Sequence, residues 1–153
     1  MSKMDVHFSS ENGEWGTPQV FFDKLYTEFH FVLDVAATEK NTKCPLYLDK
    51  EFDGLSVVWL NGWYCNPPYG RQVGKWVKKA VEESLKGRYG VMLLPSRTDT
   101  KWFSYIWSHK THRPRKWVRE IRFIKGRLKF EGAKDFAPFP SMLVIFGRPK
   151  WTD

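Results

Sequence analysis

Apolar and polar positions along the chain predict helices separated by short buried strands. Two stretches carry apolar residues at helical spacing, one over 17–29 and one over 73–85. Their apolar members are Val20, Phe21, Leu25 and Phe29 in the first, and Val73, Trp76, Val77, Ala80, Val81 and Leu85 in the second. Apolar runs at 31–33, 63–65 and 89–94 predict strands. This alternation indicates an α/β fold with a doubly wound sheet.

The ends of both helices carry residues that favour helix termini. Thr17 is predicted to be the N-cap of the first helix, with Pro18 at its first position, where a missing N–H is harmless. Gly87 is predicted to end the second helix. Residues 38–62 hold small polar residues, and we expect them to be irregular, with at most one short strand or helix.

The last part of the chain is predicted to extend the sheet with antiparallel strands. β-branched residues concentrate over 118–124 and 142–146, and 126–130 is predicted to be a hairpin arm between them. Residues 1–14 are polar, and we expect them to form a flexible lead-in. The remaining 15–153 are then expected to form a single domain.

Three polar segments are predicted to meet at one edge of the sheet. Asp34 follows the strand at 31–33, Asn66 follows the strand at 63–65, and Ser96 and Arg97 follow the strand that ends at Pro95. Sites in doubly wound sheets lie at the carboxyl ends of the strands. The hydrophobic pattern therefore predicts a functional site at this edge.

Charge changes the picture, because it is distributed unevenly. The net charge of +8 combines 5 Lys/Arg and 10 Asp/Glu over residues 1–62 with 20 and 7 over 63–153. The span 101–129 holds ten basic residues against Glu120 alone, with tryptophan, tyrosine and phenylalanine between them. A basic surface with interleaved aromatic side chains is typical of nucleic-acid binding, since bases stack on aromatic faces.

Other classes of protein fit less well. The longest apolar runs are too short to cross a bilayer, and no secretory signal is recognisable, so we expect a cytoplasmic protein. Cys44 and Cys65 lie far apart, and the four histidines do not cluster with them. This spacing predicts neither a disulfide framework nor a metal site.

Asn66-Pro67-Pro68-Tyr69 is the segment with the clearest chemistry. Two prolines hold the backbone rigid and remove two donors, so that their carbonyls stay free to accept hydrogen bonds. Asn66 adds a side-chain carbonyl, and Tyr69 adds an aromatic face. The segment therefore suits a planar group that carries an NH2.

The chain resembles the phage-type DNA N-6-adenine methyltransferases. Asn66-Pro67-Pro68-Tyr69 matches the (Asn/Asp/Ser)-Pro-Pro-(Tyr/Phe) signature of amino-group methyltransferases, and the wider resemblance runs from Trp15 to Gly147. Seven blocks occur in order: Trp15-Gly16-Thr17-Pro18, Leu33-Asp34-Val35-Ala36-Ala37-Thr38, Asp53-Gly54-Leu55, Asn66-Pro67-Pro68-Tyr69-Gly70, Leu94-Pro95-Ser96-Arg97-Thr98-Asp99-Thr100-Lys101-Trp102-Phe103, Gly126-Arg127-Leu128-Lys129-Phe130 and Pro138-Phe139-Pro140-Ser141.

The resemblance implies a Rossmann-like fold that binds S-adenosylmethionine and methylates the N6 amine of adenine in double-stranded DNA. It implies that Asn66, Pro67, Pro68 and Tyr69 are catalytic: the Asn66 oxygen and the Pro67 carbonyl accept from the amine, and Tyr69 stacks on a flipped base. The rivals are methylation of a protein glutamine or of cytosine N4. From a different class, a nucleic-acid-binding module without activity is also possible.

The resemblance also implies a cofactor site around the first strand end. The expected cofactor-binding residues are Thr17, Pro18, Asp34, Ala36, Ala37, Asp49, Asp53 and Asn66. Asp34 would accept from the cofactor's ammonium group, Asp49 or Glu51 from its ribose, and Asp53 from its adenine. The stretch lacks a Gly-x-Gly, and Val35 stands where the family usually has proline.

Basic residues of the second half are expected to contact DNA. They are Arg97, Lys101, Arg113, Arg115, Lys116, Arg127 and Lys129. Contacts of this kind to phosphates position a duplex without reading its sequence. Arg97 and Asp99 could line the base pocket or form an ion pair, and both interpretations stay open.

Overall fold

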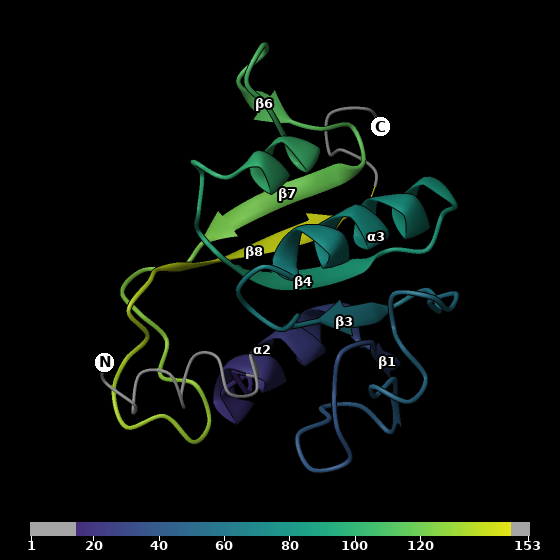
Figure 1. The fold of residues 1–153 in the computed structure, drawn as a ribbon, viewed down its shortest axis with the longest axis vertical. Helices are drawn as coiled ribbons and strands as arrows, with labels where there is room; N and C mark the ends of the chain where they lie inside the picture. The colour runs from purple at the N-terminus through teal and green to yellow at the C-terminus, as the bar shows by residue number, and fades with distance from the viewer. Residues whose placement is uncertain (1–14, 148–153) are drawn as a thin grey trace.

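A computed structural model describes residues 15–147 and places six strands in one sheet (Figure 1). The strand order is β2-β1-β3-β4-β8-β7. The first four strands run parallel, whereas β8 is antiparallel to both β4 and β7. The strands are β1 Leu33–Asp34, β2 Leu46–Tyr47, β3 Trp63–Cys65, β4 Gly90–Pro95, β7 Val118–Phe123 and β8 Ser141–Phe146. The predicted α/β architecture with antiparallel C-terminal strands is therefore confirmed.

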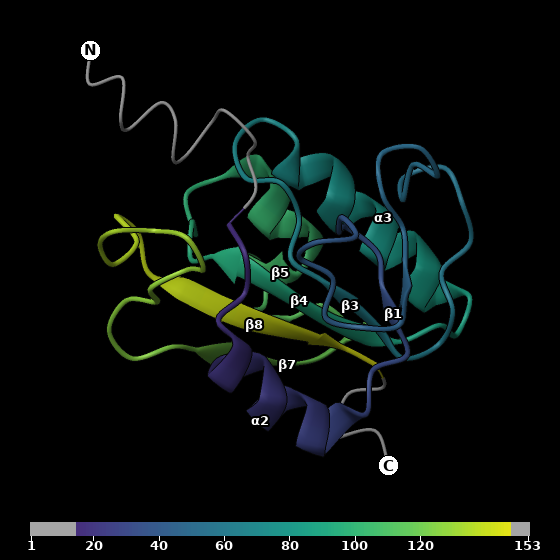
Figure 2. The ribbon, with the colours of Figure 1, turned by 90° about the horizontal axis from the view of Figure 1, so that it is seen from below.

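Helices cover both faces of the sheet, as Figure 2 shows. α2 (Gln19–Phe29) lies against one face and α3 (Val73–Leu85) against the other. Successive side chains of a strand point to opposite faces. Accordingly, Met92 and Leu94 of β4 pack in the core beneath α3, while Val91 and Leu93 pack in the core beneath α2.

The start of the first helix differs from the prediction. The helix begins at Gln19, its N-cap is Pro18, and no side chain caps it. Thr17 is buried, and its hydroxyl lies 2.7 Å from the hydroxyl of Tyr64. The N-cap prediction for Thr17 was wrong because a partner 47 residues away in sequence takes the hydroxyl that would have capped the helix.

The predicted stripe of the second helix is confirmed except at its end. Val73, Trp76, Val77 and Ala80 are buried, but Leu85 is 62% exposed. The last turn buries the polar Glu83 and Ser84 instead. Glu83 accepts hydrogen bonds from the Trp59 N–H at 2.8 Å and from Arg88 at 2.9 Å. These partners allow a charged side chain to be buried in the last turn, where the pattern had placed Leu85.

The segment 126–130 is not a strand, so the predicted hairpin arm was wrong. The Leu128 carbonyl accepts from the Ala137 N–H at 2.8 Å, and the Glu131 N–H donates to the Gly16 carbonyl at 2.8 Å. Leu128 and Phe130 alternate with cations because both side chains pack into the core on the α2 side of the sheet. They do so without forming a strand. The backbone next to this segment therefore bonds to Gly16, a residue distant in sequence, and not to an adjacent strand of a hairpin.

The remaining connections follow the pattern more closely. Residues 38–62 contain only the short strand β2, as predicted. The 31–33 run is shifted, because β1 covers Leu33–Asp34 and Val32 is 43% exposed. After β4 come a 3-10 helix, η2 (Lys101–Tyr105), and a small hairpin of β5 (Trp107–Ser108) and β6 (Arg113–Pro114).

Residues 15–147 contain neither a helix that could cross a membrane nor a cluster of metal ligands. No helix there has the length and apolar character that a bilayer crossing needs. Over the same residues, His, Cys, Asp and Glu side chains do not gather in threes as a metal site would require. The lead-in predicted for residues 1–14 lies outside the described residues.

Candidate functional site

A pocket opens where β1 and β3 end, at the edge of the sheet that the strand pattern predicted. Seven of the eight expected cofactor residues line it: Thr17, Asp34, Ala36, Ala37, Asp49, Asp53 and Asn66. Pro18 is the exception, since it is not among the lining residues. Parallel pairing of β1 with β3 brings Asp34 and Asn66, 32 residues apart in sequence, to one pocket.

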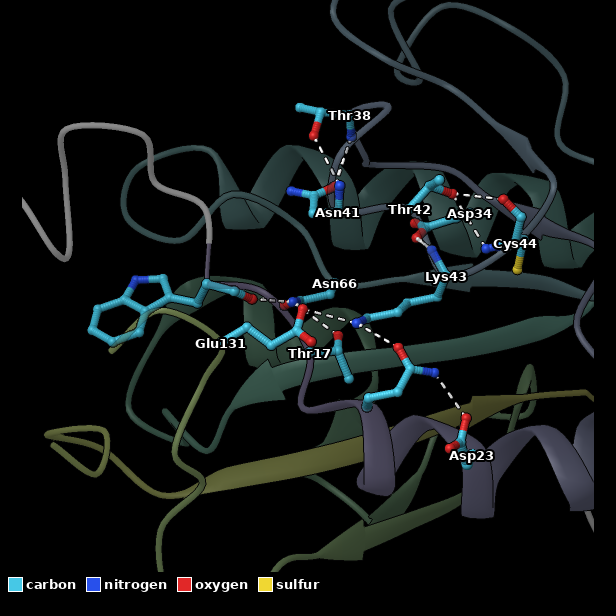
Figure 3. Close-up of polar contacts among 12 residues, drawn as sticks. Thr17, Asp23, Asp34, Thr38, Asn41, Thr42, Lys43, Cys44, Asn66 and Glu131 are labelled. Carbon is cyan, nitrogen blue, oxygen red and sulfur yellow. Dashed lines mark hydrogen bonds and ion pairs between the residues drawn. The ribbon is translucent and has the colours of Figure 1, made fainter. Parts of the chain in front are cut away.

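Asn66 is held by its nitrogen and leaves its oxygen unpaired. Its Nδ2 donates to the Trp15 carbonyl and, at 3.1 Å, to the Thr17 hydroxyl (Figure 3). Its Oδ1 is buried and has no partner within the described part of the chain. Leaving a buried acceptor unpaired costs about 1–3 kcal/mol, so an unpaired atom at a pocket wall suggests a missing donor.

The rest of the tetrapeptide is packed around this asparagine. Pro68 lines the pocket, whereas Pro67 is buried and is not among the lining residues. Tyr69 is partly buried; its hydroxyl donates to the Leu93 carbonyl at 3.1 Å, and burial raises its pKa. Its ring meets Phe139 edge to face, with centroids 5.4 Å apart. These contacts fix the plane of the Tyr69 ring.

Asp34 organises the loop that follows β1. One carboxylate oxygen accepts from the Lys43 N–H at 3.0 Å, and the other is 3.4 Å from the Ala36 N–H. The side chain is only 3% exposed, and burial raises its pKa to about 7, although these hydrogen bonds lower it in part. Burial therefore makes this carboxyl a weaker acid than an exposed aspartate.

The two other predicted acids, Asp49 and Asp53, line the same pocket. Asp49 follows β2, and one of its oxygens accepts from the N–H groups of Glu51 and Phe52 at 3.0 and 3.2 Å. Its second carboxylate oxygen makes no hydrogen bond within residues 15–147. Glu51, the alternative to Asp49, does not line the pocket. Asp53 lines it in a left-handed conformation with φ 52°.

Lys43 is a pocket residue that the sequence analysis missed. Its side chain is 5% exposed, and its ammonium donates to Glu131 at 2.8 Å and to Gln19 at 2.9 Å. Figure 3 shows the side chain extending from the Asp34 loop towards Thr17 and Glu131. An ammonium has three donors, so one remains for a ligand. Other lining residues that were not expected in the cofactor site are Trp15, Gly16, Asn41, Leu48, Lys50, Gly54 and Trp76.

The predicted DNA contacts fall in separate places. Arg113 lies on β6, which Figure 1 shows well apart from the 124–140 segment that holds Arg127 and Lys129. Lys116 is exposed, while Arg115 is half-buried and donates to the Ser104 carbonyl at 2.9 Å. Lys101 is exposed at the start of η2.

Arg97 and Asp99 lie outside the pocket that holds the expected cofactor residues. They form an exposed ion pair at 3.8 Å, as one of the two interpretations expected. Their place in a pocket for the target base stays a prediction. A contact of Arg97 with DNA remains a prediction.

Comparisons with known proteins agree with this geometry. The chain is 36% identical over 99 residues to the DNA N-6-adenine-methyltransferase of Haemophilus phage HP1 (strain HP1c1), a match that covers 61% of this chain and 56% of that protein. It is 33% identical over 93 residues to the DNA N-6-adenine-methyltransferase of Escherichia phage T1, covering 59% and 39%. The chain thus spans about half the length of these relatives, or less. Residues 6–150 match the family model described as DNA N-6-adenine-methyltransferase (Dam), so the chain belongs to that family.

Proposed function

We propose that this chain transfers a methyl group from S-adenosylmethionine to the N6 amine of adenine in DNA. The observation that carries the proposal is the buried Oδ1 of Asn66, a pocket residue, which has no hydrogen-bond partner among residues 15–147. An exocyclic amine offers N–H donors, which is what such an acceptor lacks. Membership of the adenine methyltransferase family supports adenine as the group that bears the amine.

Asn66 would act by accepting a hydrogen bond that strengthens as the reaction proceeds. The lone pair of the adenine amine is delocalised into the ring, which makes the nitrogen a poor nucleophile. Acceptance of its N–H groups by the Asn66 oxygen and the Pro67 carbonyl favours a pyramidal nitrogen and stabilises its developing positive charge. Pro68 keeps this turn rigid, and alignment of the reacting atoms supplies further acceleration.

The pocket residues fit S-adenosylmethionine by their chemistry. The cofactor supplies an electrophilic methyl on a sulfonium, and its amino-acid end carries one ammonium and one carboxylate. Asp34 would accept from the ammonium, and Lys43 is placed to donate its remaining N–H to the carboxylate. Asp49 has an oxygen available for ribose hydroxyls, and Asp53 would meet the adenine amine. Thr17, Ala36 and Ala37 complete the wall, on a Rossmann-like scaffold.

DNA would reach the pocket with its target base flipped out. A duplex hides the adenine amine, and Tyr69 offers the ring on which a flipped base could stack. Arg127 and Lys129 are basic residues on the segment that also reaches Gly16, so we assign them the nearest phosphates. Arg97, Lys101, Arg113, Arg115 and Lys116 would extend the contact. We propose that the protein acts in the cytoplasm of a bacterial host, as the phage relatives suggest.

One labelling experiment tests the proposed function. Tritiated S-adenosylmethionine is incubated with unmethylated plasmid DNA, and in parallel with a protein acceptor, and the products are digested and identified. We expect label in N6-methyldeoxyadenosine. Label in N4-methyldeoxycytidine or in protein glutamine would overturn the assignment of adenine. If the protein binds DNA but transfers no label to any acceptor, the chain is a binding module.

A further inference from the structure

We propose that Thr17 and Tyr64 are positioning residues that hold the amide of Asn66 with its oxygen towards the substrate. The proposal rests on the proposed function of Asn66 as the acceptor for the target amine. Asn66 Nδ2 donates to the Thr17 hydroxyl at 3.1 Å, and that hydroxyl lies 2.7 Å from the hydroxyl of Tyr64. Thr17 is 3% exposed and Tyr64 is fully buried, so water does not compete for these bonds.

An asparagine at this position needs something to decide which end of its amide faces the pocket. The oxygen and nitrogen ends have nearly the same shape, and only their hydrogen-bond partners distinguish them. The wrong orientation would present N–H donors to a substrate amine that itself carries donors. It would also set the Asn66 oxygen against the Trp15 carbonyl, which can only accept. The Trp15 carbonyl therefore selects the productive orientation, and the Thr17 hydroxyl, which bonds in turn to Tyr64, holds the amide nitrogen there.

Thr17 is free to perform this task because it does not cap the helix that follows it. α2 begins after Pro18 without a side-chain cap. The backbone of the segment is itself fixed, since the Gly16 carbonyl accepts from the Glu131 N–H at 2.8 Å. The hydrogen bond from Glu131 to Gly16 thus holds Thr17 and the Trp15 carbonyl in place beside Asn66.

Tyr64 is the more informative of the two residues. It is fully buried on β3 among apolar side chains, packing edge to face against Phe22 with centroids 5.1 Å apart. A phenylalanine would fill this core position, so the hydroxyl requires a separate explanation. Tyr64 does not line the pocket, so it acts on the reaction only through Thr17 and Asn66.

The experiment compares Tyr64→Phe, Thr17→Val and Thr17→Ser in single-turnover methylation. We expect Tyr64→Phe to lower the rate of methyl transfer about tenfold, and Thr17→Val up to about 100-fold, because a misplaced reacting group can cost that much. Thr17→Ser keeps the hydroxyl and should restore most of the rate. The affinity of Tyr64→Phe for S-adenosylhomocysteine, measured by calorimetry, should equal that of the wild type.

Ile145→Val is the matched control, since it trims the same core beneath α2 without touching a hydrogen bond. If Ile145→Val slows transfer as much as Tyr64→Phe does, the effect is one of stability and the proposal is wrong. It is equally wrong if Thr17→Ser is as slow as Thr17→Val, or if neither hydroxyl deletion slows transfer.

A second measurement does not depend on activity. In 15N NMR spectra, the side-chain NH2 of Asn66 should exchange slowly with water in the wild type and faster in Thr17→Val and Tyr64→Phe. Slow exchange in a wild type that methylates no adenine would separate the two ideas: the amide is held, but the proposed function fails. Fast exchange in the wild type would overturn the positioning role itself.

Discussion

Asp34 and Asn66 occupy equivalent places at the ends of neighbouring parallel strands, yet the hydrogen bonding of their side-chain oxygens differs. The Asp34 carboxylate is satisfied by N–H groups of its own loop, from Ala36 and Lys43. The Asn66 amide is bound at one end only, and its Oδ1 is left without a partner in the described chain. The polar group of the first turn therefore shapes the loop, whereas the second turn leaves an acceptor open, which we propose a ligand occupies.

The difference indicates where substitutions will affect chemistry and where they will affect stability. A group that is already satisfied contributes to the folded state. A group that is buried but unpaired contributes only when its ligand arrives, and natural proteins retain such a cost at functional sites.

Replacing Asn66 should have the largest effect. We expect Asn66→Ala to lower the rate of methyl transfer by about 100- to 1,000-fold, the usual consequence of removing one stabilising group from a reacting centre. Binding of S-adenosylhomocysteine should change little, because Asp34 and Lys43 remain. Tritium transfer and calorimetry measure the two quantities, and Leu85→Ala, on the exposed end of α3, serves as control. A variant with near wild-type rate would remove Asn66 from the mechanism.

Glu83 tests the opposite extreme, a buried polar group whose partners are all present. Burial opposes its ionisation, but hydrogen bonds from Arg88, the Trp59 N–H and Lys79 lower its pKa. Glu83→Ala leaves these donors unpaired, and we expect a loss of about 3 kcal/mol in the free energy of unfolding. Urea denaturation measures this loss. Methyl transfer by the folded fraction should be unchanged, and a strong loss of activity would show that the network reaches the site.

Asp34→Asn should affect stability in a pH-dependent direction. The folded-state pKa is raised from 3.8 to about 7, so the cost of burying the charge is absent below pH 3.8 and complete above pH 7. The amide nitrogen of the variant cannot accept from one of the two N–H groups that Asp34 binds, which costs stability at every pH. The stability of the variant relative to the wild type is nevertheless expected to improve from pH 5 to pH 8, at about 1.4 kcal/mol per pKa unit. Thermal unfolding at both pH values measures the difference.

The same substitution should weaken the cofactor site. An amide cannot offer a negative charge to an ammonium group, so the affinity of Asp34→Asn for S-adenosylhomocysteine should fall, while its stability relative to the wild type improves between pH 5 and pH 8. A variant that binds as tightly as the wild type would show that Asp34 only shapes its loop. A stability difference that is the same at pH 5 and pH 8 would contradict the buried charge.

Substitutions of single basic residues should have the smallest effects. Arg127→Ala and Arg113→Ala are each expected to reduce the salt dependence of DNA binding by about one ion. Arg127, on the segment that pairs with Gly16, should matter more for methyl transfer than Arg113 on the distant hairpin. Fluorescence anisotropy at several salt concentrations measures the binding. Affinity that does not depend on salt would contradict the basic-surface interpretation.

The spacing of apolar residues was sufficient to predict helices and strands that need only apolar neighbours, whichever these are. Val73, Trp76, Val77 and Ala80 bury one face of α3 whatever they pack against, so helical spacing alone predicts them. The buried runs at 63–65 and 90–95 are likewise recognisable as strands, since the interior of a sheet accepts any apolar side chain. Because parallel strands end at a common edge, the same pattern placed Asp34 and Asn66 together.

Specific partners were not predictable in this way. Thr17 is of a residue type that commonly caps helices, but its hydroxyl bonds to Tyr64 and Asn66, which are 47 and 49 residues away. Lys43 belongs to no recognisable motif. Its ammonium is held at the pocket by an ion pair with Glu131, which is 88 residues further along the chain.

The sequence by itself thus determined the sheet, its two faces and the tetrapeptide at the end of β3. Tertiary structure alone decided which end of the Asn66 amide is free, and which cation lines the pocket. The physical reason is that apolar burial is non-directional and tolerates many partners. A hydrogen bond, in contrast, requires one particular atom at one distance and angle, and long-range folding supplies that atom.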